Sequence, residues 1–285
     1  TRWLSEWDGP IIASLHNYRL TCSNGLFFRN GRICTDCVEK GAGSAVLHAC
    51  YRDSRLATLP LALSRKGTRN DFSNVNTVVT TSEFSDQVVR KYIDANFHTT
   101  VIPNFGSDGG LVANEVRSST TWLAAGRMSP EKGFVELVRD WPAREPLLIV
   151  GDGPERSKVE HAASGRNIQV RSSIPREDFR RLLASSQGFI FPSRWFEADP
   201  QVVVEAMSLG VPTVALNVNS AAPIVLRSGA GAVYSSAYDL GAALAAVRAD
   251  RTIMSRAARG EFSRRWTKER WLERITRLYE RVTRE

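Results

Sequence analysis

Residues 191–212 read Phe-Pro-Ser-Arg-Trp-Phe-Glu-Ala-Asp-Pro-Gln-Val-Val-Val-Glu-Ala-Met-Ser-Leu-Gly-Val-Pro. A short, wholly apolar strand ends at the first of these residues, and a loop carrying Glu197 follows it. A helix then begins near Pro200, because proline suits the first turn of a helix. Glu205 lies within that helix, and Gly210 ends it before the next strand begins. The stretch therefore predicts a strand–loop–helix–strand unit.

Similar short apolar runs alternate with helical periods along most of the chain. Runs that are apolar on both faces are typical of parallel sheets buried on both sides. The candidate strands are Ile11–Leu15, Thr77–Thr80, Thr100–Ile102, Trp122–Ala125, Leu147–Val150, Ile168–Val170, Phe189–Phe191 and Thr213–Leu216. The candidate helices are Phe134–Asp140, Pro154–Ala163, Arg176–Ser185, Val202–Leu209 and one that opens after Ser82 as N-cap. This alternation predicts an α/β fold built from βαβ units.

A turn-rich stretch at residues 103–110 predicts a division into two Rossmann-like domains. We expect an N-terminal domain over 1–110, with a Cys-rich insert at 20–52, and a C-terminal domain over 111–265. Because only three candidate strands precede the division, we expect the first domain to lack its first strands. Residues 266–285 have the spacing of one amphipathic helix, which we expect to pack back towards the N-terminal domain.

The two carboxylates of the opening stretch stand where ligands bind in such folds. Ligands of open α/β sheets bind beyond the carboxyl ends of the strands, which places Glu197 at the ligand mouth. The start of the helix that carries Glu205 offers free N–H donors to an anion. Each carboxylate can accept paired hydroxyls, such as the vicinal diols of a sugar or of a ribose. The pattern favours a ligand that combines an anion with sugar hydroxyls.

The chain resembles a known enzyme family through five segments in family order. They are the Glu-x7-Glu pattern of Glu197 and Glu205, the Gly-Arg-x-x-x-x-Lys-Gly element within Ala125–Gly133, the strand and turn Leu148–Pro154, the stretch Ile102–Asn104, and His16–Cys22. With them the chain, over residues 8 to 280, is similar to the retaining glycosyltransferases of family 4. The resemblance implies the GT-B fold, in which two Rossmann-like domains have parallel sheets that face each other across a cleft.

The resemblance also implies a donor site in the C-terminal domain. Arg127 and Lys132 would hold the diphosphate of a UDP-, GDP- or dTDP-sugar, with Gly126 and Gly153 at the same site and Glu205 on the ribose. A forked Arg and a point-charge Lys can stabilise the departing diphosphate where other folds use a divalent metal, so no catalytic metal is expected. By themselves, the residues also allow surface charges at Arg127 and Lys132 and a solvated helix residue at Glu205.

The reacting sugar would meet two further side chains. By resemblance, Glu197 contacts hydroxyls of the donor sugar, and His16 lies near the reacting sugar; His16 could equally be a structural histidine. The implied function is transfer of a sugar, with retention of configuration, to a hydroxyl acceptor that is a sugar, a lipid-linked sugar or a small molecule. Cell-surface polysaccharide, glycolipid or natural-product glycoside synthesis would need such a step. We expect the acceptor hydroxyl to attack from the same face through an oxocarbenium-like state, since the sequence identifies no side chain as a covalent nucleophile.

All four cysteines of the chain lie within the insert, at Cys22, Cys34, Cys37 and Cys50. A Cys-x2-Cys pair with two outlying cysteines suits a tetrahedral structural Zn²⁺, and the Asn-Gly dipeptides between the first two supply the tight turns of a small ribbon. Reduced thiols and disulfides remain open alternatives, and His48 could replace one cysteine.

Composition bounds the other possibilities. The chain has 285 residues, of which 42% are hydrophobic and 24% charged, and its net charge is +8. These values exclude a disordered chain, and no apolar run reaches the length of a membrane-spanning helix. We expect a cytoplasmic protein. The apolar run Leu56–Leu63, flanked by Arg52, Arg55, Arg65, Lys66 and Arg69, could touch a membrane from its inner face or could be a core helix with a basic rim.

Two other functions compete with an active transferase. One is an inactive or partner-dependent transferase fragment that binds only nucleotide. The other is a zinc-containing nucleic-acid-binding protein, which the charge and the cysteines would explain but the two glutamates would not. We therefore expect no nucleic-acid partner.

Overall fold

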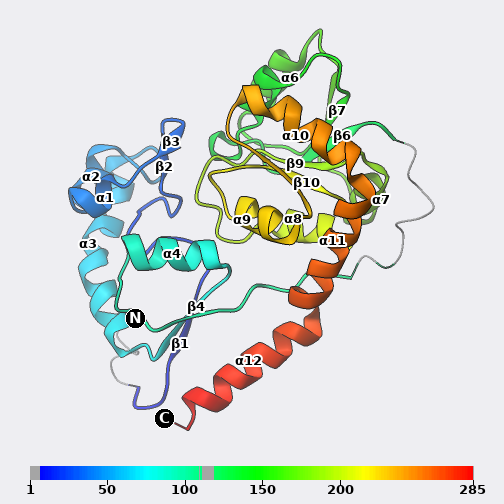
Figure 1. Cartoon of the computed structure of the whole chain (residues 1–285). Coiled ribbons are helices and arrows are strands. Elements are labelled where there is room, and N and C mark those ends of the chain that lie inside the picture. The colour runs from blue at the N-terminus through cyan, green and yellow to red at the C-terminus, as the bar shows by residue number, and fades with distance from the viewer. Residues whose placement is uncertain (1–6, 109, 111–118, 285) are drawn as a thin grey trace. The chain divides into compact units, whose positions relative to one another are not determined.

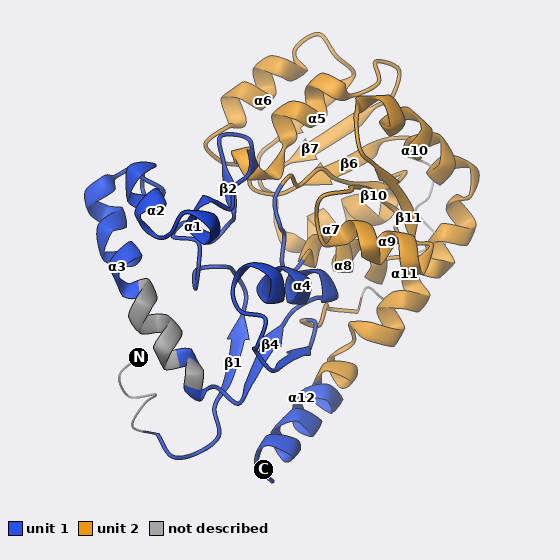
Figure 2. Cartoon of the chain, turned by 60° about the vertical axis from the view of Figure 1, so that its left-hand side comes forward, with its two compact units in different colours: residues 1–103, 195–199, 272–285 blue, residues 104–194, 200–271 orange. Residues whose placement is uncertain are grey.

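The computed structural model describes residues 7–108, 110 and 119–284, with the backbone alone for residues 65–71 and 73. These residues form two compact units (Figure 2). Unit 1 consists of residues 1–103, 195–199 and 272–285, and unit 2 of residues 104–194 and 200–271. The division falls at Pro103, a few residues before the predicted one. It also assigns a five-residue loop of the opening stretch to unit 1, which a linear division of the sequence could not anticipate.

Unit 2 contains a six-stranded parallel sheet with the strand order β11-β10-β9-β6-β7-β8 (Figure 1). Its strands are β6 (Trp122–Ala125), β7 (Leu147–Val150), β8 (Ile168–Arg171), β9 (Phe189–Phe191), β10 (Thr213–Leu216) and β11 (Gly231–Tyr234). Its helices are η4 (Pro130–Lys132), α5 (Phe134–Asp140), α6 (Arg156–Ala163), α7 (Arg176–Ser185), α8 (Gln201–Ser208), α9 (Ala221–Ser228), α10 (Ala237–Ala249) and α11 (Arg251–Arg265), followed by the start of α12 (Lys268–Val282).

Alternate residues of the unit 2 strands supply two separate hydrophobic cores. Leu123, Leu148 and Phe189 join one core with residues of α7, α8, α9 and α11. Their chain neighbours Trp122 and Ile149 join the other core, with residues of α5, α6 and α10. Successive side chains of a strand point to opposite faces, so a strand that is apolar throughout needs helices on both sides. The doubly wound α/β architecture predicted from the apolar runs is confirmed.

Unit 1 contains a three-stranded parallel sheet with the order β1-β4-β5. The strands are β1 (Ile12–Leu15), β4 (Thr77–Thr80) and β5 (Thr99–Val101). Its other elements are the antiparallel pair β2 (Phe28–Arg29) and β3 (Arg32–Ile33), the helices α1 (Asp36–Glu39), α2 (Gly43–Leu47), α3 (Arg55–Asp71), η2 (Phe72–Asn74) and α4 (Glu83–Tyr92), and the end of α12. Asn30 and Gly31 both have positive φ in the turn between β2 and β3, as the predicted tight turn requires.

Most predicted elements lie within a residue or two of their observed bounds. The sequence pattern missed β11, whose residues Gly-Ala-Val-Tyr are mostly half-buried and include a glycine, so its apolar signal is weak. The predicted tail helix from Trp266 begins instead at Lys268. Trp266 is the C-cap residue of α11, its N–H donates to the carbonyl of Phe262, and its side chain is buried in a core that includes residues of α8 and α11.

Candidate functional site

The loops that follow β6 and β7 meet at the carboxyl edge of the unit 2 sheet. The N–H of Met128 donates to the carbonyl of Asp152 at 2.8 Å, and the N–H of Gly126 donates to the carbonyl of Val150 at 3.1 Å. A Cβ atom on Gly153 would lie 2.4 Å from the carbonyl oxygen of Met128. Only glycine therefore permits the two loops to approach this closely. The structure brings the predicted Gly126 and Gly153 together.

The loop that follows β9 joins the same edge. The N–H of Arg194 donates to the carbonyl of Glu131 at 2.8 Å. Gly133 has φ +71°, and a Cβ atom there would lie 2.6 Å from the carbonyl oxygen of Pro192. Three loops, each from the carboxyl end of a parallel strand, thus converge where ligands of α/β sheets bind.

Two predicted cationic residues stand on the loop after β6. Arg127 is exposed, and its guanidinium has no hydrogen-bond or ion-pair partner among the described residues. Lys132 is half-buried at the end of η4, directly before Gly133. An exposed guanidinium without an internal counter-charge is available to an anionic ligand. Arg127 therefore presents a positive charge to solvent at the edge where the loops converge.

Asp152 fixes the loop after β7 to the loop after β8. Its Oδ2 accepts the N–H of Ser173 at 2.7 Å, and its Oδ1 pairs with Arg156. The hydrogen bond from the Ser173 backbone is the main reason why the pKa of Asp152 lies below its usual range, and Arg156 adds to the effect. The ionised Asp152 carboxylate therefore holds together the loops that follow β7 and β8.

Glu205, on α8, is paired with two arginines of α7. Its Oε1 lies 3.3 Å from Nε of Arg176 and 3.3 Å from a guanidinium nitrogen of Arg180. The Glu205 side chain is 16% exposed, so it is no freely solvated helix residue. Sequence reasoning missed both arginines. They have helical i, i+4 spacing on α7, but no local pattern connects them with a carboxylate that follows Arg180 by 25 residues.

Glu197 belongs to unit 1 and is 8% exposed. Its Oε2 accepts the indole N–H of Trp195 at 2.9 Å. Tyr18 is 1% exposed, and its hydroxyl has no hydrogen-bond partner among the residues that the structure describes. Burial, and secondly the negative charge of Glu197, raise the pKa of Tyr18 well above its usual range. Glu197 is thus an ionisable group held among buried aromatic side chains, and Trp195 was not singled out from the sequence.

The backbone next to Glu197 is fixed by two hydroxyls of unit 1. Thr81 and Ser82 donate to the carbonyl of Ala198 at 3.0 and 2.8 Å. The ring of Phe196 stacks on Tyr92 with centroids 5.8 Å apart. These contacts explain why residues 195–199 group with unit 1, although unit 2 flanks them on both sides in the sequence.

His16 directly follows β1 and is exposed. It belongs to unit 1, as Glu197 does, whereas Arg127, Lys132, Gly126, Gly153 and Glu205 belong to unit 2. The structure thus places each predicted residue beyond a carboxyl strand end or on the helix that follows, and divides them between the units. Because the His16 side chain is exposed, a buried structural role for this histidine is excluded.

The four cysteines of the insert carry free thiols. Burial and, after it, the neighbouring thiols Cys37, Cys22 and Cys34 raise the pKa of Cys50 to about 11. His48, the alternative ligand, instead lies 3.3 Å from Asp36. Within the described part of the chain, no group of three or more His, Cys, Asp and Glu side chains is arranged to hold a metal ion. The zinc site stays a prediction.

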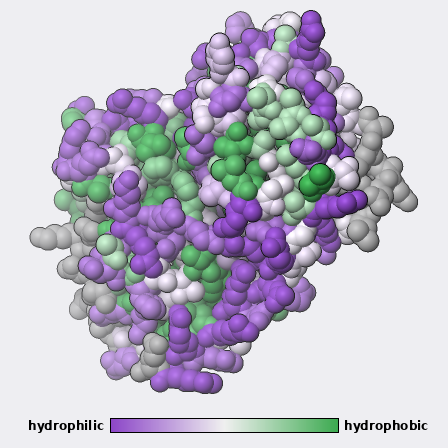
Figure 3. Space-filling model, in the orientation of Figure 1, coloured by the Kyte–Doolittle hydropathy of each residue, from purple (hydrophilic) through white to green (hydrophobic). Residues whose placement is uncertain are grey.

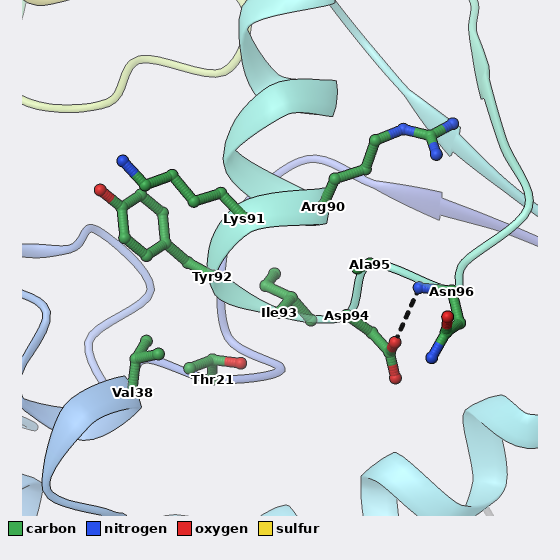
Figure 4. Close-up of a pocket in the computed structure, with 9 residues that line it drawn as sticks. All are labelled: Thr21, Val38, Arg90, Lys91, Tyr92, Ile93, Asp94, Ala95 and Asn96. Atoms are coloured by element: carbon green, nitrogen blue, oxygen red, sulfur yellow. Dashed lines mark hydrogen bonds between the residues drawn. The ribbon is translucent and has the colours of Figure 1, made fainter.

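Unit 1 has a pocket of about 350 Å³ at the end of α4 (Figure 4). It is lined by Thr21, Val38 and residues 90–96. The N–H of Asn96 donates to the carboxylate of Asp94 at its mouth, and the side chains of Lys91 and Tyr92 lie along one side (Figure 4). None of the predicted site residues lines this pocket.

One face of α3 is apolar and exposed. Leu56 is 83% exposed, Leu59 42% and Leu63 70%, so the core-helix interpretation of this run is wrong for these side chains. Arg52 and Arg55 beside them are exposed, whereas the side chains of Arg65, Lys66 and Arg69 lie outside the described residues. Hydrophilic residues cover most of the molecular face seen in Figure 3, with smaller apolar patches between them. Among the described helices, none is long and apolar enough to cross a membrane.

Comparison with known proteins finds a family-model match within unit 2. Residues 119–250 match the model of the family "Glycosyl transferases group 1". An uncharacterized glycosyltransferase of Haemophilus influenzae is 35% identical over 105 residues, which are 34% of this chain and 30% of that protein. The matched region covers 14–30% of the length of the curated relatives.

Solved structures extend the likeness to the whole fold. Sucrose-phosphate synthase from Thermosynechococcus elongatus has a TM-score of 0.69 at 19% identity, covering 99% of this chain and 70% of the other. HepE of Anabaena, in complex with UDP and glucose, has a TM-score of 0.63 at 18% identity, covering 95% and 71%. The chain therefore has the GT-B fold, and its residues 119–250 match the family model of the glycosyl transferases group 1.

Proposed function

We propose that the chain is a retaining glycosyltransferase of family 4 that moves a sugar from a nucleotide-diphosphate-sugar to a hydroxyl acceptor. The observation that carries the proposal is the carboxyl edge of the unit 2 sheet. Glycines close the loops after β6, β7 and β9 onto one another there, and the family segment within them presents Arg127 and Lys132.

In the proposed donor site, Arg127 and Lys132 bind the diphosphate, beside the loops of Gly126 and Gly153. Glu205 accepts hydrogen bonds from the ribose. Negative charge grows on the diphosphate oxygens as the bond to the sugar breaks, and the two cations stabilise that charge without a catalytic metal. UDP-, GDP- and dTDP-sugars share the groups that these residues recognise. The binding of UDP by the similar HepE of Anabaena supports a nucleotide donor.

Glu197 and His16 would act on the transferred sugar. Glu197 accepts hydrogen bonds from hydroxyls of the donor sugar. His16, which is exposed directly after β1, contacts the sugar near its reacting carbon. We propose same-face attack by the acceptor hydroxyl through an oxocarbenium-like state, which gives retention. The acceptor would be a sugar, a lipid-linked sugar or a small molecule, of the kind used in cell-surface polysaccharide, glycolipid or glycoside synthesis.

Nucleotide titration with matched variants tests the donor site. Arg127→Ala and Lys132→Ala should each weaken binding of UDP, GDP or dTDP by about 1.5–3 kcal/mol in calorimetry, the usual scale for hydrogen bonds to charged groups. Arg144→Ala is the control, because Arg144 is exposed before β7, at the amino end of that strand. Unchanged affinity in both site variants would remove the phosphate assignment.

Turnover assays then separate an active transferase from a nucleotide-binding fragment. UDP-, GDP- and dTDP-sugars are incubated with the chain and candidate acceptors, and release of the nucleoside diphosphate is followed. Binding without release, in the presence of acceptors, would favour the inactive or partner-dependent alternative. Transfer with inversion at the anomeric carbon would contradict the retaining assignment.

We also propose peripheral contact of unit 1 with an anionic membrane through the exposed face of α3. The exposed Leu56, Leu59 and Leu63 beside the exposed Arg52 and Arg55 support it, since apolar side chains with a basic rim favour anionic lipid surfaces. Vesicles with and without phosphatidylserine provide the test. Leu56→Ser with Leu63→Ser should reduce co-sedimentation, while Leu226→Ser, an exposed leucine of unit 2, should not. Equal sedimentation of all variants would contradict this contact.

A structural zinc ion in the insert remains part of the proposal. The Cys-x2-Cys spacing of Cys34 and Cys37, with Cys22 and Cys50 in the same insert, supports it, because four cysteines can supply the tetrahedral sulfur set of a structural zinc site. Elemental analysis of protein purified without chelator should find about one zinc per chain. Metal-free protein with four reactive thiols would exclude the site.

A further inference from the structure

The guanidinium groups of Arg176 and Arg180, two of the three arginines of α7, contact only one oxygen of Glu205. Both Arg176 and Arg180 donate to Oε1. Among the described residues, no donor is hydrogen-bonded to Oε2. A carboxylate has lone pairs on both oxygens, so half of the accepting capacity of Glu205 is unused. The carboxylate is held from one side and open on the other.

Arg180 is the better anchored of the two arginines. Its side chain is 19% exposed, against 66% for Arg176. Its second guanidinium nitrogen donates to the carbonyl of Asp108 at 3.2 Å. One planar guanidinium thus joins α7, α8 and the segment that follows residue 103, an arrangement that suits its fixed fork of donors.

A further arginine completes this network at the other end of α8. Arg259, on α11, pairs with Asp108 at 2.6 Å and donates to the carbonyl of Ser208 at 2.7 Å. Asp108 is therefore held from both sides, and with it the carbonyl that Arg180 contacts. The position of Arg180 is set by the fold of unit 2 before any ligand arrives.

We propose that Arg180, with Arg176 as the weaker partner, positions the Glu205 carboxylate so that Oε2 accepts hydrogen bonds from a vicinal diol of the nucleotide ribose. This inference rests on the proposed function of unit 2 as a nucleotide-sugar site. The arginines act through Glu205 and are positioning residues.

The physical gain is preorganisation. A glutamate side chain has several rotamers, and fixing one of them on binding costs free energy that a previously fixed side chain does not spend. The paired arginines hold Oε1 in the free protein, and Oε2 is then already oriented for hydroxyl donors. Loss of Arg180 should therefore weaken the recognition of ribose hydroxyls specifically, whereas the phosphate contacts of Arg127 and Lys132 remain.

The test compares two ligands that differ only in these hydroxyls. Calorimetry with the full chain measures the affinities of UDP and of its 2′,3′-dideoxy analogue, with GDP and its dideoxy analogue as a second pair. The affinity ratio within a pair reports hydroxyl recognition, because phosphate and base contacts cancel. Wild-type protein should prefer the ribose form by about tenfold or more, since each hydrogen bond to a charged group contributes about 1.5–3 kcal/mol.

Arg180→Met should reduce that ratio to about threefold or less, as expected when the ordering of one side chain is shifted to the binding step. Arg180→Lys should restore part of it, because lysine keeps the charge but loses the fork. Arg181→Met is the matched control, because Arg181 lies on the same helix, its side chain is 74% exposed, and within the described part of the chain it pairs only with Glu177 and Asp178. It should keep the wild-type ratio.

Three results would overturn the inference. In the first, Arg180→Met lowers the affinities for both ligands of a pair equally, which indicates a general structural role. In the second, the wild type binds UDP or GDP and their dideoxy forms equally well. Glu205 then does not bind the ribose hydroxyls, whereas the proposed phosphate site is unaffected. In the third, no nucleotide binds to the wild type, and the proposed function fails as well. If Arg180→Met does not fold, Arg176→Met, at a more exposed position, must show a smaller fall of the same ratio.

Discussion

Glu197 and Glu205 illustrate how two residues of one sequence motif acquire different environments. Glu197 is enclosed by aromatic side chains of unit 1 and accepts the indole N–H of Trp195. Glu205 is held by arginines on a helix of unit 2. Both residues are glutamates of one Glu-x7-Glu pattern, so the side chains that surround them are what distinguishes the two carboxylates. Different effects of the same substitution are expected.

Glu197→Gln and Glu205→Gln should separate sugar chemistry from nucleotide binding. In the proposed site Glu197 touches only the transferred sugar, so its substitution should lower kcat while the affinity for free UDP or GDP stays within about twofold. Glu205→Gln leaves a neutral amide beside two arginines and should weaken the binding of the sugar-free nucleotide by about 1–3 kcal/mol. Calorimetry and turnover assays on both variants check the assignment. The reverse pattern would show that the two roles are exchanged.

Asp152 should stabilise the protein in a pH-dependent way. Because its folded pKa is lowered, its contribution is present above the unfolded pKa of about 3.9 and is lost as the pH falls through the folded value. Asp152→Asn should therefore lower Tm at pH 7, and the difference from wild type should narrow below about pH 4. Thermal melts between pH 3 and 8 measure it, with the exposed Asp178→Asn as control. A difference that does not change with pH would contradict the ionic origin.

At the scale of one element, the N-terminus of α4 has two tasks. Ser82 accepts the N–H of Ser85 at 3.0 Å in a capping box, and the same hydroxyl donates to the carbonyl of Ala198 in the Glu197 loop. A helix cap and a tertiary anchor therefore share one buried side chain. The N-cap of α10, Ser236, accepts Tyr238 N–H but lies at the surface.

These two caps form a matched pair for mutation. Ser236→Ala removes the cap and a hydrogen bond to Asp239, both within the first turn of α10, and should lower the free energy of unfolding by about 0.5–1 kcal/mol. Ser82→Ala also leaves the buried N–H of Ser85 and the Ala198 carbonyl with fewer partners, and should cost about 2–3 kcal/mol. Urea denaturation measures both. Equal losses would mean that the contact with Ala198 contributes nothing.

At the scale of the whole molecule, the two units differ in how far their sheets are enclosed. The strands β6, β7 and β9 of unit 2 have neighbours on both sides and helical cores on both faces. In unit 1, β1 stands at the edge of the described three-stranded sheet and is mostly half-buried. Strands with fewer buried contacts open at lower free-energy cost.

Hydrogen exchange should follow this difference. Amides of Leu147–Val150 and Phe189–Phe191 should exchange last, near the rate of global unfolding, and amides of Ile12–Leu15 should exchange earlier. Mass spectrometry of peptides across both units resolves the order. Nucleotide should raise protection of the loops after β6 and β7 in unit 2, with a smaller effect on β1. Slower exchange at β1 than at β7 would contradict the proposed order of stabilities.

The sequence by itself determined the α/β architecture, most strand bounds, the Ser82 cap and the glycines and cations of the loops at the carboxyl edge of the unit 2 sheet. These features depend on local rules: the alternation of faces in a strand, the spacing of a helix, the need for glycine where loops close together. Tertiary structure alone decided that residues 195–199 join unit 1, that Arg176 and Arg180 hold Glu205, and that the leucines of α3 are exposed. Each is a contact, or the lack of one, between segments far apart in the chain, and such contacts have no period or spacing from which they could be predicted.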